Sequence, residues 1–171
     1  MDSIRNFDTR ALRDTFGCFA TGVTIVTTVN GSGEFFGLTA NSFTSLSLDP
    51  PLVLFCLDYN ALSFDAFHET SNFVVNVLSE GQKELSAHFA RSSVDKWNGV
   101  DYETWKTGCP VLPESIAVLE CLTISRHEGG DHLIIIGQVE RIKHDPGETK
   151  PLLYFKSTDK VALLLEPDKN L

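Results

Sequence analysis

The feature that most restricts the fold of this sequence is a hairpin pattern close to its start. Residues 23–29 alternate aliphatic with hydroxyl side chains, which is the period of a half-buried strand. Asn30-Gly31-Ser32-Gly33 follows at once, and glycine tolerates the positive φ that a tight hairpin turn needs. Residues 35–39 supply the return strand. This pattern favours antiparallel pairing of neighbouring strands over the alternating strands and helices of a parallel sheet.

Later segments continue the strand pattern. Residues 52–57 are continuously apolar, so we expect this strand to be covered on both faces. Residues 73–78 and 161–165 are further short apolar strands. Residues 116–126 and 132–143 are expected to form a long antiparallel pair around a turn that holds two glycines.

Three short helices are expected between the strands. The first covers residues 8–20, with Asp8 or Thr9 as its N-cap and one apolar face made by Leu12, Phe16 and Phe19. Ser63 can cap a second helix, which carries Phe64 and Phe67. Ser79-Glu80-Gly81-Gln82 is a capping box, and the helix that it opens is expected to run to about Phe89.

These elements predict a mainly β fold, an antiparallel Greek-key barrel with a few short helices. Residues 91–115 contain several glycine and proline breaks and are expected to be a loop. The 171 residues fit one domain. Neither an internal repeat nor a linker divides them, so we expect a single domain over residues 1–171.

Charge and hydropathy exclude several classes of partner. The net charge is -9, from 14 basic and 23 acidic residues, and such a surface repels nucleic acids and anionic membranes. The start lacks the apolar run of a signal peptide, and residues 51–57, the longest apolar run, are too few to span a bilayer. We expect a soluble cytoplasmic protein, in which the glycosylation sequon at Asn30 stays unused.

The cysteines and histidines give no metal-binding pattern. The four cysteines form no C-x-x-C pair and lack the spacing of a zinc site, so we expect buried free thiols at Cys18, Cys56, Cys109 and Cys121. His127 and His132 flank an acidic turn, but no third ligand lies at a useful spacing, and no metal is expected.

A polar stretch follows the first hairpin. Residues 37–51 carry five side-chain hydroxyls and one amide, and end in a double proline. We expect a hydroxyl-rich loop here, whose neutral donors suit a phosphate, a ribityl chain or the edge of a heteroaromatic ring. The same residue types also favour ordinary turns, so the composition leaves both interpretations open. The chain has no Walker loop, G-x-G-x-x-G or G-x-S-x-G motif.

Four segments in a fixed order resemble the flavin reductase-like family. They are residues 19–24 (FATGVT), 39–51 (TANSFTSLSLDPP), 73–78 (FVVNVL) and 130–132 (GDH), and the resemblance extends over residues 12–154. That family supplies reduced flavin to two-component monooxygenases. The resemblance implies an FMN-binding split barrel, usually a homodimer, that reduces free or loosely held FMN or FAD with NADH or NADPH.

The resemblance also assigns expected contacts with the flavin. It places Thr39, Ala40, Asn41 and Ser42 along the flavin ring and ribityl chain, and Ser45 and Ser47 near the phosphate. Backbone groups of Cys56, Leu57 and Asp58 are expected to face the flavin. Ser63, at a helix start, could hold a phosphate. In the segment Phe89, Ala90 and Arg91, the arginine is the candidate that neutralises the phosphate.

On the nicotinamide side, the resemblance implies a role for His132, and Tyr154 matches an aromatic residue near the same pocket. The family commonly continues after this tyrosine with a glycine-containing turn and a second tyrosine. Here residues 156–160 read KSTDK, which puts the cover of the pyridine-nucleotide pocket in doubt.

Hydride transfer between two cofactors needs positioning and no strong acid or base, which explains the missing catalytic triad. Two other functions fit the same fold: a flavoprotein that retains FMN and passes electrons to iron or another protein, such as a ferric reductase, and a non-enzymatic flavin or haem binder. The choices between FMN, FAD and riboflavin and between NADH and NADPH stay open, as does the identity of the monooxygenase partner.

Overall fold

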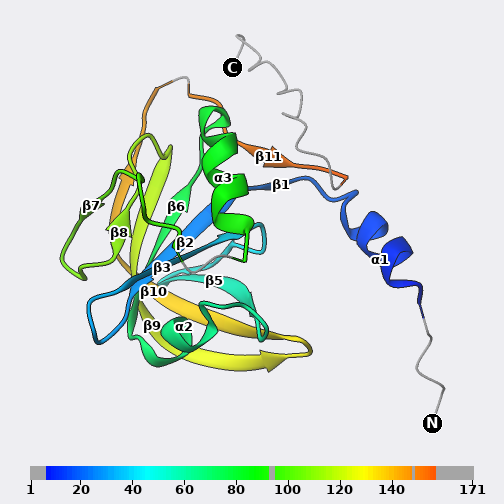
Figure 1. Cartoon of the computed structure of the whole chain (residues 1–171), viewed down its shortest axis with the longest axis horizontal. Coiled ribbons are helices and arrows are strands. Elements are labelled where there is room, and N and C mark those ends of the chain that lie inside the picture. Colours follow the sequence, from blue (N-terminus) through cyan, green and yellow to red (C-terminus); the bar gives the residue numbers. More distant parts are fainter. Residues whose placement is uncertain (1–6, 93–94, 148, 157–171) are drawn as a thin grey trace.

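The computed structural model describes residues 7–92, 95–147 and 149–156, and its centre is one antiparallel sheet (Figure 1). The sheet has seven strands in the order β3-β2-β6-β9-β10-β5-β4. Their bounds are β2 (Thr24–Val29), β3 (Phe35–Ala40), β4 (Thr44–Leu48), β5 (Pro51–Asp58), β6 (Asn72–Val77), β9 (Ala117–Gly129) and β10 (His132–His144). The predicted hairpins are present as β2-β3 and β9-β10, and Gly33 has the positive φ, 82°, that the first turn requires.

The two edges of this sheet meet where the chain passes from β3 to β4. Only residues 41–43 lie between these strands, yet the strands occupy opposite ends of the strand order. The sheet therefore curls until its edges are close, as in a barrel. Within the described residues no ladder joins β3 to β4, so the barrel is split along this line. The predicted antiparallel split barrel is confirmed, and the connection after β3 lies at the split.

Smaller elements surround the barrel. The helices are α1 (Thr9–Phe16), α2 (Phe64–Glu69) and α3 (Lys83–Ala90), and the short 3-10 helix η1 (Glu80–Gln82) leads into α3. Two two-stranded ladders pair β1 (Thr21–Gly22) with β11 (Leu153–Tyr154) and β7 (Glu103–Thr104) with β8 (Pro110–Val111). None of the helices in the described part of the chain is long and apolar enough to cross a bilayer.

The core fills the inside of the barrel with aromatic rings. Phe55 lies at the centre, in edge-to-face contact with Phe67 at 5.8 Å and with Phe73 at 5.2 Å between ring centroids. The prediction that residues 52–57 are covered on both faces was wrong, because burial alternates along β5. One face of this strand is fully buried, whereas Cys56 and its neighbours on the other face are only half-buried.

The hydroxyl-rich loop predicted after the strand at 35–39 was also wrong in part, because residues 44–48 are strand. Thr44, Leu46 and Leu48 alternate with two serines, which is strand periodicity, and this segment forms β4 at the edge of the sheet.

The predicted loop at 91–115 contains β7 and β8. The buried carboxylate of Glu120 holds the turn between them, accepting hydrogen bonds from Thr107 N (2.7 Å) and Oγ1 (2.8 Å). The expected strand at 161–165 lies outside the described residues.

The first helix is shorter and more exposed than predicted. Asp8 caps it by accepting a hydrogen bond from Arg10 N at 3.2 Å, and Gly17 ends it, so Phe19 lies beyond the helix. The expected apolar face does not pack on the barrel, since Phe16 is 67% and Phe19 76% exposed. Figure 1 shows α1 standing away from the body of the molecule, joined to it through β1.

All four cysteines are free thiols, but not all are buried as expected. Cys109 and Cys121 are buried, and burial raises the pKa of Cys121 to about 12. Cys56 is half-buried and Cys18 is exposed near the end of α1. No three His, Cys, Asp or Glu side chains in the described residues are grouped as a metal site.

The predicted capping box before α3 is confirmed and gives a stability prediction. The side-chain oxygen of Gln82 accepts hydrogen bonds from Ser79 N (3.0 Å) and Ser79 Oγ (3.4 Å). Because Ser79 is buried, Ser79→Ala removes a bond that water does not replace. We expect a loss of about 0.5–1 kcal/mol in the free energy of unfolding, measured by chemical denaturation. Ser32→Ala, in the exposed β2-β3 turn, should leave this free energy unchanged; equal losses in both variants would contradict the capping role.

Candidate active site

A groove of about 470 Å³ opens at the split of the barrel. The end of β3 and the connection that follows it form one wall, and the end of β5 forms the floor. The C-terminal end of α3 and the tip of the β9-β10 hairpin close the remaining sides. The groove is lined by Leu38, Thr39, Ala40, Asn41, Ser42, Cys56, Leu57, Asp58, Asn60, Ala61, Leu62, Ser63, Phe89, Ala90, Arg91, Ser92, Lys96 and His132. All predicted site residues except Ser45, Ser47 and Tyr154 are among them.

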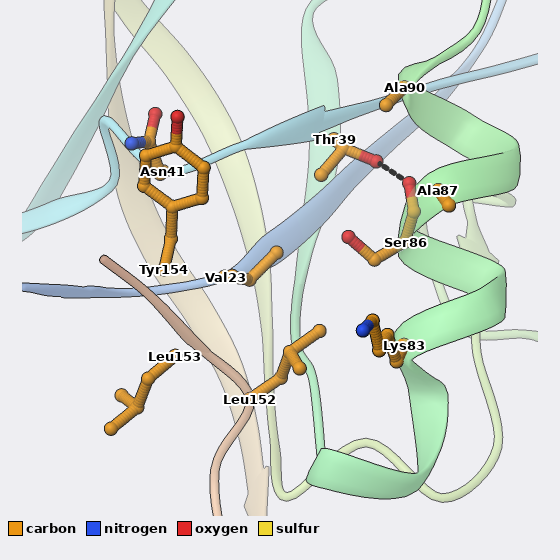
Figure 2. A pocket seen from close by; sticks show the side chains of 10 residues that line it. All are labelled: Val23, Thr39, Asn41, Lys83, Ser86, Ala87, Ala90, Leu152, Leu153 and Tyr154. Atoms are coloured by element: carbon orange, nitrogen blue, oxygen red, sulfur yellow. Dashed lines mark hydrogen bonds between the residues drawn. The ribbon is translucent and has the colours of Figure 1, made fainter. Parts of the chain in front are cut away.

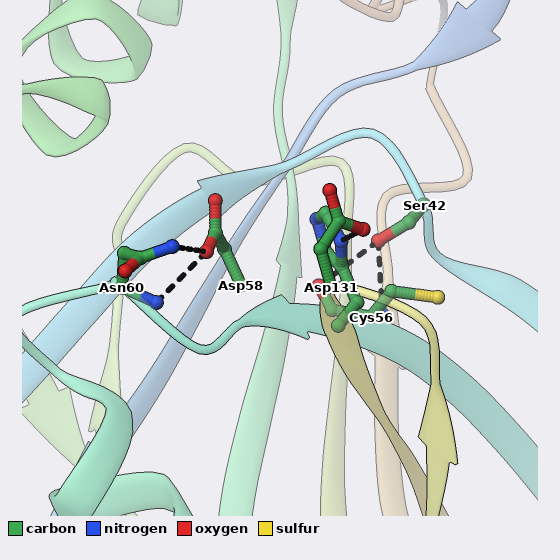
Figure 3. A network of polar contacts seen from close by, with 6 residues as sticks. Ser42, Cys56, Asp58, Asn60 and Asp131 are labelled. Carbon is green, nitrogen blue, oxygen red and sulfur yellow. Dashed lines mark hydrogen bonds and ion pairs between the residues drawn. The ribbon is translucent and has the colours of Figure 1, made fainter. Parts of the chain in front are cut away.

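The wall and the floor of the groove are joined by Ser42. Its Oγ accepts a hydrogen bond from Cys56 N at 3.0 Å and donates to Cys56 O at 3.3 Å (Figure 3). The hydroxyl that was expected along the flavin therefore bridges the β3-β4 connection to β5. The same bonds occupy backbone groups of Cys56 that were expected to face the flavin. These two hydrogen bonds between the β3-β4 connection and β5 fix the width of the split.

The hairpin tip is fixed at the other end of the groove. His132 is opposite Asp58 in the β5-β10 register, and Tyr59 N donates to Asp131 O at 3.2 Å. His132 Nδ1 bonds with Asp131 Oδ1 at 2.7 Å, and this bond and the charge of the imidazole lower the pKa of the Asp131 carboxyl. Because a carboxylate only accepts, Nδ1 carries the proton of this bond, so Nε2 is an acceptor whenever the ring is neutral.

The loop after β5 is held by its own side chains. Asp58 Oδ1 accepts hydrogen bonds from Asn60 N (2.8 Å) and Asn60 Nδ2 (3.1 Å) (Figure 3). This turn leads to Ser63, which is buried in the groove wall at the start of α2 and makes no side-chain capping bond. Since α2 has only six residues, its dipole adds little to phosphate binding at Ser63.

Two cations lie at the end of the groove formed by α3. Arg91 is the exposed C-cap residue of that helix. Lys96 Nζ donates to Phe89 O at 2.7 Å and to Gly37 O at 3.2 Å, and burial lowers the pKa of its amine. Phe89 itself is buried, in edge-to-face contact with Trp97 at 5.1 Å. An anionic group bound here would therefore meet two positive charges on a rigid aromatic support.

A second hollow, which we call the α3 pocket, adjoins the groove and has a volume of about 290 Å³. Figure 2 shows the side chains that line it: Val23, Thr39, Asn41, Lys83, Ser86, Ala87, Ala90, Leu152, Leu153 and Tyr154. Thr39 Oγ1 donates to Ser86 O at 2.6 Å, which fixes α3 against β3. Tyr154 thus lies in this pocket rather than in the groove, with its ring beside Asn41.

The remaining predicted residues, Ser45 and Ser47, are not brought to the groove. Both lie on β4, the edge strand that pairs with β5, and neither lines the groove. Lys156, the first residue of the segment that departs from the family, has φ 52°, a left-handed conformation that favours glycine. The rest of that segment lies outside the described residues.

Sequence reasoning missed six residues that line the groove: Leu38, Asn60, Ala61, Leu62, Ser92 and Lys96. The most consequential is Lys96, because it adds a second positive charge beside Arg91. It lies in a stretch without strand or helix periodicity, so no pattern marked it. Asn60 had a weak signal, since an Asp-x-Asn turn directly after a strand is typical of a rigid loop.

Comparison with known proteins agrees with this geometry. The family model described as a flavin reductase like domain matches residues 16–161. The chain belongs to this family. It is 49% identical over 133 residues to a probable flavin reductase of Rhizobium meliloti, which covers 78% of this chain but only 43% of that protein. It is 39% identical over 150 residues to the reductase subunit of a flavin-dependent monooxygenase of Mycobacterium tuberculosis, covering 87% of this chain and 80% of that subunit.

A solved structure extends the likeness to the whole fold. The NADH:FAD oxidoreductase of Streptomyces globisporus, in complex with NAD and FAD fragments, superimposes with a TM-score of 0.87 at 38% identity, covering 99% of this chain and 100% of that one. The predicted family and split-barrel fold of this flavin reductase-like domain are confirmed. The roles of individual site residues stay predictions.

Proposed function

We propose that this flavin reductase-like domain transfers hydride from a reduced nicotinamide nucleotide to FMN or FAD. The observation that carries the proposal is the groove, which brings apolar side chains, an amide, two cations and a carboxylate-held histidine into one site. The relatives support it, since one is named as a monooxygenase reductase subunit and one structure as an NADH:FAD oxidoreductase.

The residues of the groove fit a flavin. A flavin has a heteroaromatic ring with polar edges, a hydroxylated chain and a phosphate. The groove offers apolar contact from Ala40 and Leu57, an amide at Asn41, and positive charge at Arg91 and Lys96. When bound, the flavin supplies the acceptor for the hydride that a dihydronicotinamide gives up.

The protein contributes position and shape to this reaction. The bonds of Ser42 to Cys56 keep the groove open at one width, so the bound rings need no rearrangement of the walls. Asp131 fixes the ring of His132 at the mouth, where Nε2 can accept a hydrogen bond from the carboxamide of a nicotinamide. No group has to move a proton at the reacting atoms.

We also propose that the reduced flavin is released to a partner monooxygenase in the cytoplasm. Two results would separate such a diffusible-flavin reductase from the two other functions that fit the same fold. A diffusible-flavin reductase loses its flavin during gel filtration, whereas a protein that passes electrons to iron or another protein retains FMN. A non-enzymatic flavin or haem binder shows no flavin-stimulated oxidation of NADH or NADPH. Crossing both nicotinamides with FMN, FAD and riboflavin in one steady-state assay also gives the preferred pair.

We also propose a homodimer, in which a second copy covers α1. This helix has no buried residue, and Phe16 at its end and Phe19 just beyond it are exposed. A hollow lined by Arg13, Phe16, Gly17, Asn41 and Tyr154 makes the apolar surface of α1 continuous with the groove. Such an exposed aromatic patch is typical of an interface.

The dimer gives a direct prediction. Sedimentation at micromolar concentration should show a particle of twice the 18.9 kDa chain mass, because burying Phe16 and Phe19 in both copies favours association. Phe16→Asp should shift the population toward monomer, whereas Ile142→Asp, at the far end of β10 from His132, should leave it unchanged. A wild-type monomer with full activity would contradict the proposal.

A further inference from the structure

The last turn of α3 is tied to β3 through Lys96. The amine of this lysine donates to Phe89 O at 2.7 Å and to Gly37 O of β3 at 3.2 Å. The backbone oxygen of Lys96 bonds with His88 Nε2 at 2.9 Å, and because a carbonyl only accepts, this nitrogen carries the proton. The last carbonyls of a helix have no donor within the helix, so Lys96 supplies one that the end of α3 lacks.

The ring of Phe89 packs against β3 at a position where only glycine fits. A Cβ added at Gly37 would lie 2.6 Å from Phe89 Cε1 and 3.4 Å from Trp97 Cζ2. The first distance is far below van der Waals contact between carbon atoms, and the buried ring has no free space to move into. Trp97 adds edge-to-face contacts to Phe89 at 5.1 Å and to Phe35 of β3 at 5.7 Å. The end of α3, β3 and the residues around Lys96 therefore form one packed junction.

Arg91 takes its place from this junction. It is the C-cap residue of α3, two positions after Phe89, and its backbone N donates to His88 O at 3.3 Å. Its side chain is exposed and lines the groove. Within the described residues no hydrogen bond or ion pair holds its guanidinium, so the direction of this side chain depends on the backbone of the last helical turn.

The two cations of the groove thus differ in what they contact. The amine of Lys96 is directed at two carbonyl oxygens of the protein, and burial lowers its pKa. The guanidinium of Arg91 keeps its donors for a ligand, and its planar, two-pronged geometry suits a phosphate. A phosphate bound in the groove would therefore be contacted by Arg91, while Lys96 holds the helix end that presents it.

We infer that Lys96 is a positioning residue, which together with the missing side chain at Gly37 fixes the last turn of α3 so that Arg91 meets the flavin phosphate. The preference of the groove for a phosphorylated flavin over riboflavin is then set through Arg91 rather than by a contact of Lys96 itself. This inference rests on the proposed flavin site and assigns a specificity role to two residues, Lys96 and Gly37, that do not contact the phosphate.

The test measures FMN and riboflavin affinity by fluorescence quenching in Lys96→Met, Arg91→Ala and the double variant. Lys96→Met should weaken FMN about fivefold and leave riboflavin unchanged. In the Arg91→Ala background the same change should weaken FMN by less than about twofold, because the contact that Lys96 supports is already lost. Lys96→Arg, which can also donate to both carbonyls, should recover most of the FMN affinity. Lys106→Gln, an exposed lysine between β7 and β8, should change neither flavin.

A glycine variant tests the junction without removing a charge. Gly37→Ala should displace the ring of Phe89 and weaken FMN about threefold more than riboflavin, although both cations remain. Gly31→Ala is the matched control, since an added Cβ there meets nothing within 4 Å, and it should change neither affinity.

Three results would overturn the inference. If Lys96→Met weakens FMN as strongly in the Arg91→Ala background as in the wild type, Lys96 contacts the phosphate directly. Equal weakening of both flavins by Lys96→Met and by Gly37→Ala would show that the junction serves the fold alone. Unchanged FMN affinity in Lys96→Met would show that Arg91 needs no such support. A wild-type protein that binds neither flavin would instead refute the proposed flavin site, and the inference with it.

Discussion

Arg91→Ala is expected to weaken FMN binding by about tenfold or more and to leave riboflavin binding nearly unchanged. Arg91 lies at the end of α3 where the groove is lined by two cations, and a charge-assisted bond to a phosphate contributes about 1.5–3 kcal/mol. Its exposure places the effect toward the lower end of that range, because water and salt screen the charge. Fluorescence quenching of each flavin by the protein measures both affinities.

The two flavins form an internal control, since they differ only in the phosphate. Arg91→Lys should retain part of the FMN affinity because it keeps the charge while losing the planar, two-pronged geometry of the guanidinium. Equal weakening of FMN and riboflavin by Arg91→Ala would show that this residue does not contact the phosphate. Lys96, held by Phe89 O and Gly37 O, would then be the remaining cation of the groove.

His132→Ala should reduce catalysis with NADH about tenfold, in KM, in the rate of flavin reduction or in both. This corresponds to roughly 1.4 kcal/mol of transition-state binding. The reason is that Asp131 holds the imidazole so that Nε2 can accept a hydrogen bond at the mouth of the groove. As a group on the nicotinamide side, His132 should not be needed for flavin, so flavin affinity should stay nearly unchanged. Anaerobic stopped-flow reduction separates the two parameters.

A second histidine on the same hairpin provides the matched control. His127 is exposed and bonds with Ser125 Oγ at 3.1 Å, and it does not line the groove. His127→Ala should therefore leave both NADH kinetics and flavin affinity unchanged. If His132→Ala abolishes flavin binding while NADH kinetics hold, the residue belongs to the flavin site or to the fold, and the assignment is wrong.

The sequence was most informative where periodicity and turn chemistry agreed. The β2-β3 and β9-β10 hairpins were predicted because alternating side chains flank glycine-containing turns, and local geometry decides such pairs. The capping box at Ser79 was predictable for the same reason, since its hydrogen bonds are local. The segment 37–51 was misread because serine and threonine favour turns, although in β4 they alternate with leucines on an edge strand.

Long-range contacts were beyond the reach of sequence reasoning. The bonds between Ser42 and Cys56 depend on how the barrel closes, and nothing local shows that this hydroxyl bridges the β3-β4 connection to β5. Lys96 enters the groove from an irregular loop and is held there by Phe89 O, so no spacing marks it. The apolar residues of α1 were predicted from their period, but whether they pack on the barrel depends on long-range contacts, and Phe16 stays exposed.

Anaerobic mixing of NADH with FMN or FAD, with and without the protein, shows through the absorbance of both cofactors whether this domain passes hydride from a nicotinamide to a flavin in the groove at the split of the barrel. We expect one flavin to be reduced for each NADH oxidised, at a rate that saturates in both and that falls about tenfold in His132→Ala. A mixture that reacts no faster with the protein than without it would contradict the proposed hydride transfer.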